Sequence, residues 1–177
     1  MAKKPTRNHY VDNKKLLVEM TKYKESVETA KASDTERPRV PNYIGECIMK
    51  IAQHLSYKPN FINYTYKEEM ISDGIENCLL YIDNFNPEKS KNPFAYFTQI
   101  IYYAFIRRIQ KEKKQTYVKY KALENQELID EIMQGPNGTP VKNNFMEFLQ
   151  SNMDDFLADF EETQRKKKEK AKEKAKE

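Results

Sequence analysis

Residues 69–114 read EMISDGIENCLLYIDNFNPEKSKNPFAYFTQIIYYAFIRRIQKEKK and contain two helical patterns separated by a turn. The first helix is expected to begin near Tyr66, and the second to run from about Pro93 to Lys114 with the proline in its first turn. Between them, the polar residues 84–93 include two prolines and reverse the chain. The residues of the first helix that are expected to face the core are Ile71, Ile75, Cys78, Leu79 and Ile82.

The same periodicity predicts helices on both sides of this stretch. Residues 13–32 form a helical pattern that Asn13 could cap, residues 33–42 are a proline-containing connection, and a weaker helix is expected over 120–133. Only four glycines are present and no strand-like alternation persists, so the fold class is all-α. A further helix over residues 43–55 has the apolar stripe Ile44, Ile48, Ile51, Ala52 and Leu55.

Size and composition suit one modest domain with appendages. Of the 177 residues, 38% are hydrophobic and 33% are charged. No apolar run approaches the length of a membrane span, and the N-terminus lacks the apolar segment of a secretion signal. Cys47 and Cys78 have no CxxC spacing, which favours free thiols in a cytosolic chain.

Residues that could perform chemistry are scarce. His9 and His54 have no metal-ligand spacing with each other or with the cysteines. The sequence contains no glycine-rich phosphate loop and no nucleophile in a recognisable setting. We therefore expect a protein that is not an enzyme, with no catalytic residue, no metal and no cofactor.

The helix over residues 93–114 is apolar or aromatic on more than one side. Aromatic rings beside basic residues are what single-stranded nucleic acid requires, although a central core helix with a solvated basic end is an equal alternative. Its sides are a core side (Phe94, Phe97, Ile101, Ala104, Phe105), a line at steps of four, three and four (Tyr96, Ile100, Tyr103, Arg107), a third side (Tyr102, Ile106, Ile109) and a basic end (Arg107, Arg108, Lys111, Lys113, Lys114).

The order of these elements resembles region two of bacterial sigma factors, the subunits that give RNA polymerase its promoter specificity. EMISDG at residues 69–74 is similar to the acidic first helix, Phe85 and Asn86 to the turn, and YFT at 96–98 to the start of the second helix. The resemblance is strongest to the late-transcription sigma factors of T-even-type bacteriophages. It covers most of residues 10–121, including YVDNKKLL at 10–17 and KNPFAY at 91–96.

The resemblance implies that the first helix docks on the clamp helices of the largest subunit of host core RNA polymerase. The residues implied are Glu69, Ser72, Asp73, Ile75, Glu76 and Leu79. The second helix would bind promoter DNA, especially the melted non-template strand, with Tyr96 stacking on a flipped adenine. The residues implied for DNA are Tyr96, Gln99, Ile100, Tyr103, Arg107, Arg108, Lys111, Lys113 and Lys114.

Three positions depart from the family pattern. Gln99 and Ile100 stand where primary sigma factors have two tryptophans at the duplex fork, and Tyr103 stands where they have a glutamine. Strand opening or base preference is therefore expected to differ.

Residues 145–162 are acidic and apolar and contain no lysine or arginine. They resemble the motif by which the phage family binds the replication sliding clamp, with a late co-activator as a further partner. The alternative is a helix that packs back on the domain. The residues implied for sliding-clamp or polymerase-flap binding are Phe145, Phe148, Leu149, Asp155, Phe156, Leu157 and Phe160.

These observations predict a compact helical sigma region-two-like domain with a flexible C-terminal tail. The expected segments are an N-terminal helix and linker (1–42), the sigma-like domain (43–134), a Gly/Pro linker (135–144), the partner-binding peptide (145–162) and a charged low-complexity tail (163–177), which is either a solvated helix or disordered. Such a protein would act as a phage late sigma factor in the cytoplasm of an infected bacterium, associated with the nucleoid and not with a membrane. It would open a short A/T-rich, TATA-type element, with activation through the sliding clamp.

Two other functions fit the pattern. One is a helical adaptor that binds polymerase or clamp without reading DNA. The other is a non-specific single-stranded DNA-binding protein. Eight basic and five acidic residues in 161–177 leave a net charge of only +1 on residues 1–160, which speaks against the second.

Overall fold

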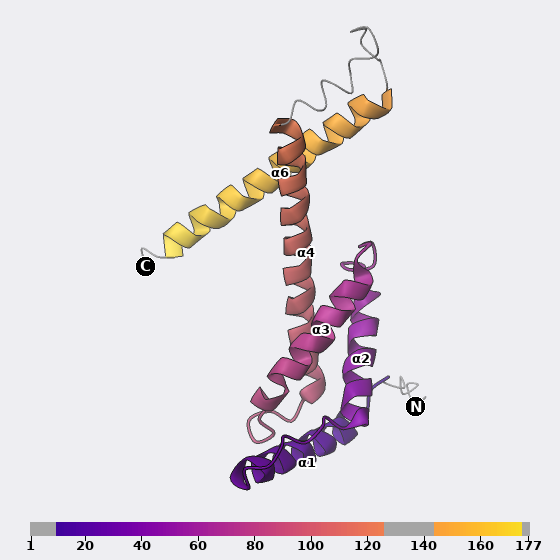
Figure 1. Ribbon diagram of the computed structural model, residues 1–177, viewed down its shortest axis with the longest axis vertical. Coiled ribbons are helices and arrows are strands. Elements are labelled where there is room, and N and C mark those ends of the chain that lie inside the picture. Colours follow the sequence, from indigo (N-terminus) through magenta and orange to yellow (C-terminus); the bar gives the residue numbers. More distant parts are fainter. Residues whose placement is uncertain (1–9, 126–143, 175–177) are drawn as a thin grey trace, which may run out of the picture. The chain divides into compact units, whose positions relative to one another are not determined.

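The computed structural model describes residues 10–125 and 144–174, and every regular element within these ranges is helical (Figure 1). The predicted all-α class is therefore confirmed. None of the described helices is both long and apolar enough to cross a membrane. The elements are α1 (Asn13–Ala32), α2 (Asn42–Ser56), α3 (Lys67–Tyr81), the 3-10 turn η1 (Ile82–Asn84), α4 (Pro93–Asn125) and α6 (Asn144–Lys174).

The chain divides into two compact units, of which the first ends at Arg108 and the second begins at Ile109. Unit 1 contains α1, α2, α3 and residues 93–108 of α4. Helix α1 is thus in the same unit as α2 and α3, whereas the segments expected from the sequence divide the chain after residue 42. Unit 2 contains the remainder of α4 and α6. In unit 1, α2 packs on both α1 and α3.

The start of α1 also organises the start of α4. Asp12, and not the predicted Asn13, caps α1, because its carboxylate accepts hydrogen bonds from the backbone N–H groups of Lys14 and Lys15. Asn13 instead accepts a hydrogen bond of 3.0 Å from the backbone N–H of Phe94. The adjacent residues Asp12 and Asn13 therefore fix the N-terminal ends of α1 and α4, which are about eighty residues apart in the chain.

The core of unit 1 confirms two of the predicted stripes. All five stripe residues of α2 are buried, and on α4 the core side is buried except for Phe94, which is half-buried. The stripe predicted for α3 is right only in part, because Cys78 and Ile82 are buried as predicted and the other three residues are not. Ile71 and Ile75 are half-buried and Leu79 is 40% exposed, while the row that faces the core is Met70, Gly74, Cys78 and, in η1, Ile82.

Gly74 explains why the row of α3 that contains it is the one buried against α4. A Cβ atom at this position would lie 3.0 Å from Cγ2 of Ile101 and 3.2 Å from Cε1 of Phe105. The absence of a side chain therefore allows α3 to approach α4 closely, and the residues one turn away on either side of the glycine are buried with it.

Helix α4 is longer than predicted, ending at Asn125 instead of Lys114. Residues 115–125 contain neither glycine nor proline, so nothing in them stops the helix. The beginning of the weaker helix expected over 120–133 is thus the end of α4, and its remainder lies outside the described residues, as does the Gly/Pro linker up to residue 143. The charged tail continues α6 as far as Lys174.

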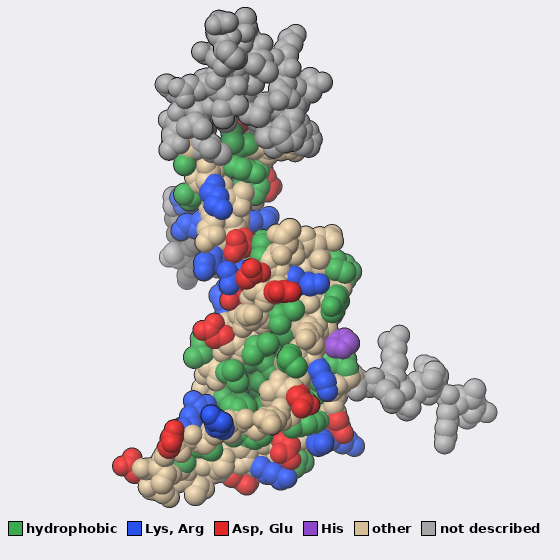
Figure 2. Space-filling model, turned by 45° about the vertical axis from the view of Figure 1, so that its right-hand side comes forward, with side chains coloured by type: hydrophobic (Ala, Val, Ile, Leu, Met, Phe, Trp, Pro, Cys, Tyr) green, Lys and Arg blue, Asp and Glu red, His purple; other side chains and the backbone are tan. Residues whose placement is uncertain are grey.

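Some apolar surface remains uncovered on unit 1. Figure 2 shows apolar side chains in the middle of one face with charged side chains around them. Among the large apolar side chains that remain exposed in unit 1 are Met49, Tyr57, Ile62, Leu79, Leu80 and Tyr81.

Both cysteines are buried free thiols, as expected. Burial raises the pKa of Cys78 to about 12, so this thiol stays protonated.

Candidate functional site

The outer face of α3 presents acidic and aliphatic side chains. Of the residues predicted to dock on polymerase, Glu69, Ser72 and Glu76 are exposed, as is Leu79, whereas Asp73 and Ile75 are half-buried. Leu80 is 68% exposed at the next position, and sequence periodicity did not single it out. An exposed leucine pair beside carboxylates suits a protein surface that carries both apolar and basic groups.

Asp73 and Arg108 bind each other, although the resemblance assigns them to different partners. Arg108 Nε donates to one carboxylate oxygen of Asp73 at 2.6 Å, and Nη2 donates to the other at 2.8 Å. The side chain of Asp73 is 30% exposed and that of Arg108 is 17% exposed. This paired geometry is the strong form of the arginine–carboxylate interaction, and it links α3 to α4.

A second cross-helix contact holds Arg107. Its Nη2 donates to Oδ1 of Asn77 at 2.7 Å, while Nδ2 of Asn77 donates to the backbone carbonyl of Asp73 at 2.7 Å. Asn77 was not among the predicted residues, because an asparagine on the polar side of a helix gives no signal in the sequence. It fixes one edge of the Arg107 guanidinium, and the other N–H groups of this exposed side chain can reach a phosphate.

Tyr96 is anchored in the protein. Its hydroxyl donates to the backbone carbonyl of Tyr81 at 2.6 Å, and its ring lies 5.3 Å from Phe85 and 5.4 Å from Phe97 between centroids. The side chain is half-buried, and burial raises its pKa.

Replacing Tyr96 with phenylalanine is expected to lower the free energy of unfolding by about 1 kcal/mol, because the Tyr81 carbonyl loses its donor while the ring packing stays. Urea denaturation followed by circular dichroism measures the change. Tyr103→Phe is the matched control and should change stability little, since Tyr103 is 52% exposed. Equal effects of the two substitutions would contradict the anchoring role.

The accessible rings of α4 lie further along the helix than Tyr96. Tyr102 is 40% exposed and stands edge-on to Tyr103, with centroids 5.6 Å apart. Gln99 is exposed and Ile100 is half-buried. Arg107 is one helical turn beyond Tyr103, so a ring and a cation share one exposed side. The predicted Lys111, Lys113 and Lys114 are exposed on the part of α4 that belongs to unit 2.

In unit 2, the predicted partner-binding peptide packs on α4. The ring of Phe160 stacks on that of Tyr117 with centroids 4.7 Å apart, and the ring of Phe156 is edge-on to Tyr120 at 5.4 Å. Leu157 is buried and Asp155 is exposed. The alternative of a helix that packs back is thus the observed arrangement. The predicted Phe145, Phe148 and Leu149 are not among the residues whose side chains the structure describes.

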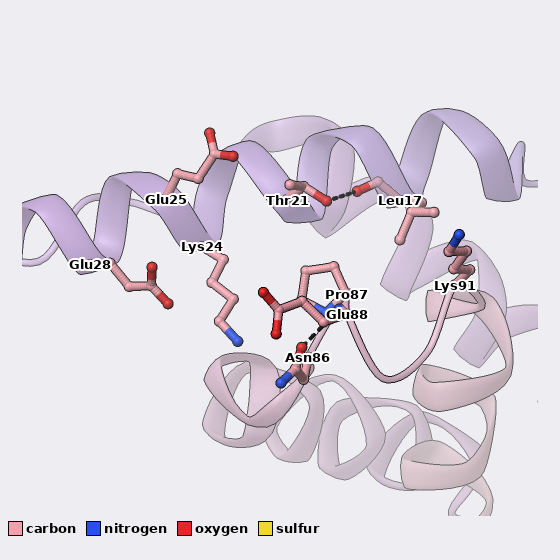
Figure 3. A pocket seen from close by; sticks show the side chains of 9 residues that line it. All are labelled: Leu17, Thr21, Lys24, Glu25, Glu28, Asn86, Pro87, Glu88 and Lys91. Carbon is pink, nitrogen blue, oxygen red and sulfur yellow. Dashed lines mark hydrogen bonds between the residues drawn. The ribbon is translucent and has the colours of Figure 1, made fainter.

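A groove of about 590 Å³ lies between α1 and the loop after η1 (Figure 3). Lys24 and Lys91 lie among three glutamates there, so the groove carries mixed charge and does not suit a polyanion. None of the predicted site residues lines it. Its lining consists of Leu17, Thr21, Lys24, Glu25, Glu28, Asn86, Pro87, Glu88 and Lys91.

Within the described ranges, no group of three or more His, Cys, Asp or Glu side chains is arranged to hold a metal ion. The candidate site in unit 1 is made of the exposed rings, cations and carboxylates on α3 and on residues 93–108 of α4. The sequence matches no protein-family model, and no curated protein is significantly similar to it.

Proposed function

We propose that this protein is a promoter-specificity subunit of bacterial RNA polymerase, of the phage late sigma type, and that it is not an enzyme. The observation that carries the proposal is the exposed side of α4 on which Tyr103 and Arg107 stand one turn apart. An exposed ring can stack on an unpaired base at about 1–3 kcal/mol, and an arginine can neutralise a phosphate. The matching order of motifs over residues 69–114 adds to this support.

The outer face of α3 is the proposed polymerase contact. Glu69 and Glu76 offer carboxylates to the basic groups of the clamp helices, and Leu79 and Leu80 offer apolar contact. Asp73 is left out of this surface, because its carboxylate is already used by Arg108. DNA and polymerase would then contact neighbouring helices of the same unit.

The proposed role of the C-terminal peptide is recruitment to the phage sliding clamp. Phe156 and Phe160 would provide the apolar anchors, as acidic and aromatic helices do in grooves of partner proteins. Because both rings contact α4 in unit 2, a clamp would have to compete with Tyr117 and Tyr120 for them.

The test is transcription by bacterial core RNA polymerase on a supercoiled template with a short A/T-rich late-type element. The protein should direct initiation at the element, and Tyr103→Ala should reduce it at least about fivefold, the loss of one stacked base contact. Val18→Ala truncates a side chain that is 52% exposed on α1, a helix that carries none of the residues proposed for DNA or polymerase, and should leave initiation unchanged.

The outcomes separate the alternatives. If the protein binds polymerase and start sites do not change, it is an adaptor. If it binds single-stranded DNA tightly and does not bind polymerase, it is a non-specific DNA-binding protein. Equal initiation by the Tyr103→Ala variant and the unsubstituted protein would rule out the proposed role of this side of α4 in binding DNA.

A further inference from the structure

The part of α4 that belongs to unit 2 continues the combination of rings and cations. Tyr117 and Tyr120 are three residues apart, and lysines stand three or four residues before and after Tyr117, so they share one side of the helix. Residues 109–121 contain five lysines and one glutamate. This stripe, defined as Lys113, Lys114, Tyr117, Tyr120 and Lys121, has the composition of a single-strand binding surface.

Helix α6 covers the aromatic part of this stripe. Phe160 stacks on Tyr117 with an interplanar angle of 24°, and Phe156 meets Tyr120 at 89°. The carboxylate of Glu161 accepts a hydrogen bond of 2.9 Å from the hydroxyl of Tyr117 and lies 3.5 Å from Nζ of Lys121.

The covering segment matches the stripe in charge as well as in shape. Residues 153–162 contain five acidic residues and no basic residue. The hydroxyl of Tyr117 and the charge of Lys121 lower the pKa of Glu161, so its carboxylate stays ionised. The segment thus places a flat ring on Tyr117 and a negative charge on Lys121, the two groups that a nucleotide would also place there.

We propose that this stripe is a second nucleic-acid-binding surface, specific for single strands over duplex, and that the acidic side of α6 occupies it in the free protein. Single-stranded nucleic acid and α6 then compete for the same rings and lysines. The proposal rests on the nucleic-acid role proposed for α4, but it does not depend on binding to polymerase.

The experiment uses the full-length protein without polymerase and measures the fluorescence anisotropy of a labelled oligothymidylate. The F156A/F160A variant removes both rings of α6 and is expected to bind about tenfold more tightly, since the competitor has lost two aromatic contacts. Adding Tyr117→Ala and Tyr120→Ala should abolish this gain. A labelled duplex should show a smaller gain than the single strand.

Two further variants separate the contributions. F156L/F160L keeps apolar packing without the ring stacking, so its affinity should lie between those of the unsubstituted protein and of F156A/F160A. Glu161→Gln removes one exposed charge without touching the packing and should raise affinity about threefold, because the competitor loses its ion pair with Lys121. Hydrogen exchange of the α6 amides reports whether the double alanine variant has opened the contact.

Three results would overturn the proposal: an opened variant that binds the oligonucleotide no more tightly, a gain that survives loss of Tyr117 and Tyr120, or an opened variant that gains affinity only for a purified sliding clamp. The last would mean that α6 hides its own protein-binding face. Failure of promoter-directed initiation, with the anisotropy result as expected, would refute the proposed function and leave this inference standing.

Discussion

Phe105→Ala is expected to lower the free energy of unfolding of unit 1 by about 3–5 kcal/mol, the usual cost of removing a buried phenylalanine ring. The side chain is fully buried, its ring is edge-on to that of Phe61 with centroids 5.2 Å apart, and it lies where α3 approaches α4 at Gly74. Removing it leaves a cavity between helices that the close crossing prevents from collapsing.

Urea denaturation measured by circular dichroism tests this value. Leu80→Ala is the matched control, since Leu80 is 68% exposed and its truncation should change stability by no more than about 0.5 kcal/mol. A loss of less than about 1 kcal/mol for Phe105→Ala would show that the two helices do not cross as closely as Gly74 indicates.

The buried side of α2 was predictable because one row of apolar residues outweighs every other row, and that of α4 because its core row contains neither a tyrosine nor an arginine, unlike the other apolar rows of that helix. Helix α3 was not, because two rows compete. The row through Ile71 and Ile75 is the more hydrophobic, yet the row through Met70 and Gly74 is buried. Hydrophobicity counts glycine as a weak core residue, whereas packing favours it where two helices must approach closely.

The candidate site was predictable as a helix but not side chain by side chain. Tyr96 and Tyr103 lie on the same line of α4, but the end of α3 places the Tyr81 carbonyl against Tyr96, and the segment after α3 places Phe85 against it. Seven residues later this segment no longer covers the helix, and Tyr103 is exposed. Periodicity gives the side of a helix that a residue occupies, but it does not say which loop will lie over it.

Arg108→Gln is expected to lower the free energy of unfolding by about 2 kcal/mol, because the carboxylate of Asp73 loses two charge-assisted hydrogen bonds in a partly buried position. Asp73→Asn should cost a similar amount, since Nε and Nη2 of Arg108 then lose the charged oxygens that accept their hydrogen bonds. If the two residues act as one pair, the double variant should be hardly less stable than either single variant, which gives a coupling energy above about 1 kcal/mol in the double-mutant cycle.

The cycle also decides what Asp73 does. If its carboxylate served only to bind polymerase, Asp73→Asn would leave the stability of the free protein unchanged and the two substitutions would be additive. Glu76→Gln is the control on the same helix: Glu76 is exposed, so stability should be unaffected while polymerase affinity falls. A coupled Asp73–Arg108 pair together with a stable but weakly binding Glu76→Gln variant would assign the pair to joining α3 to α4, and the outer carboxylates to the partner.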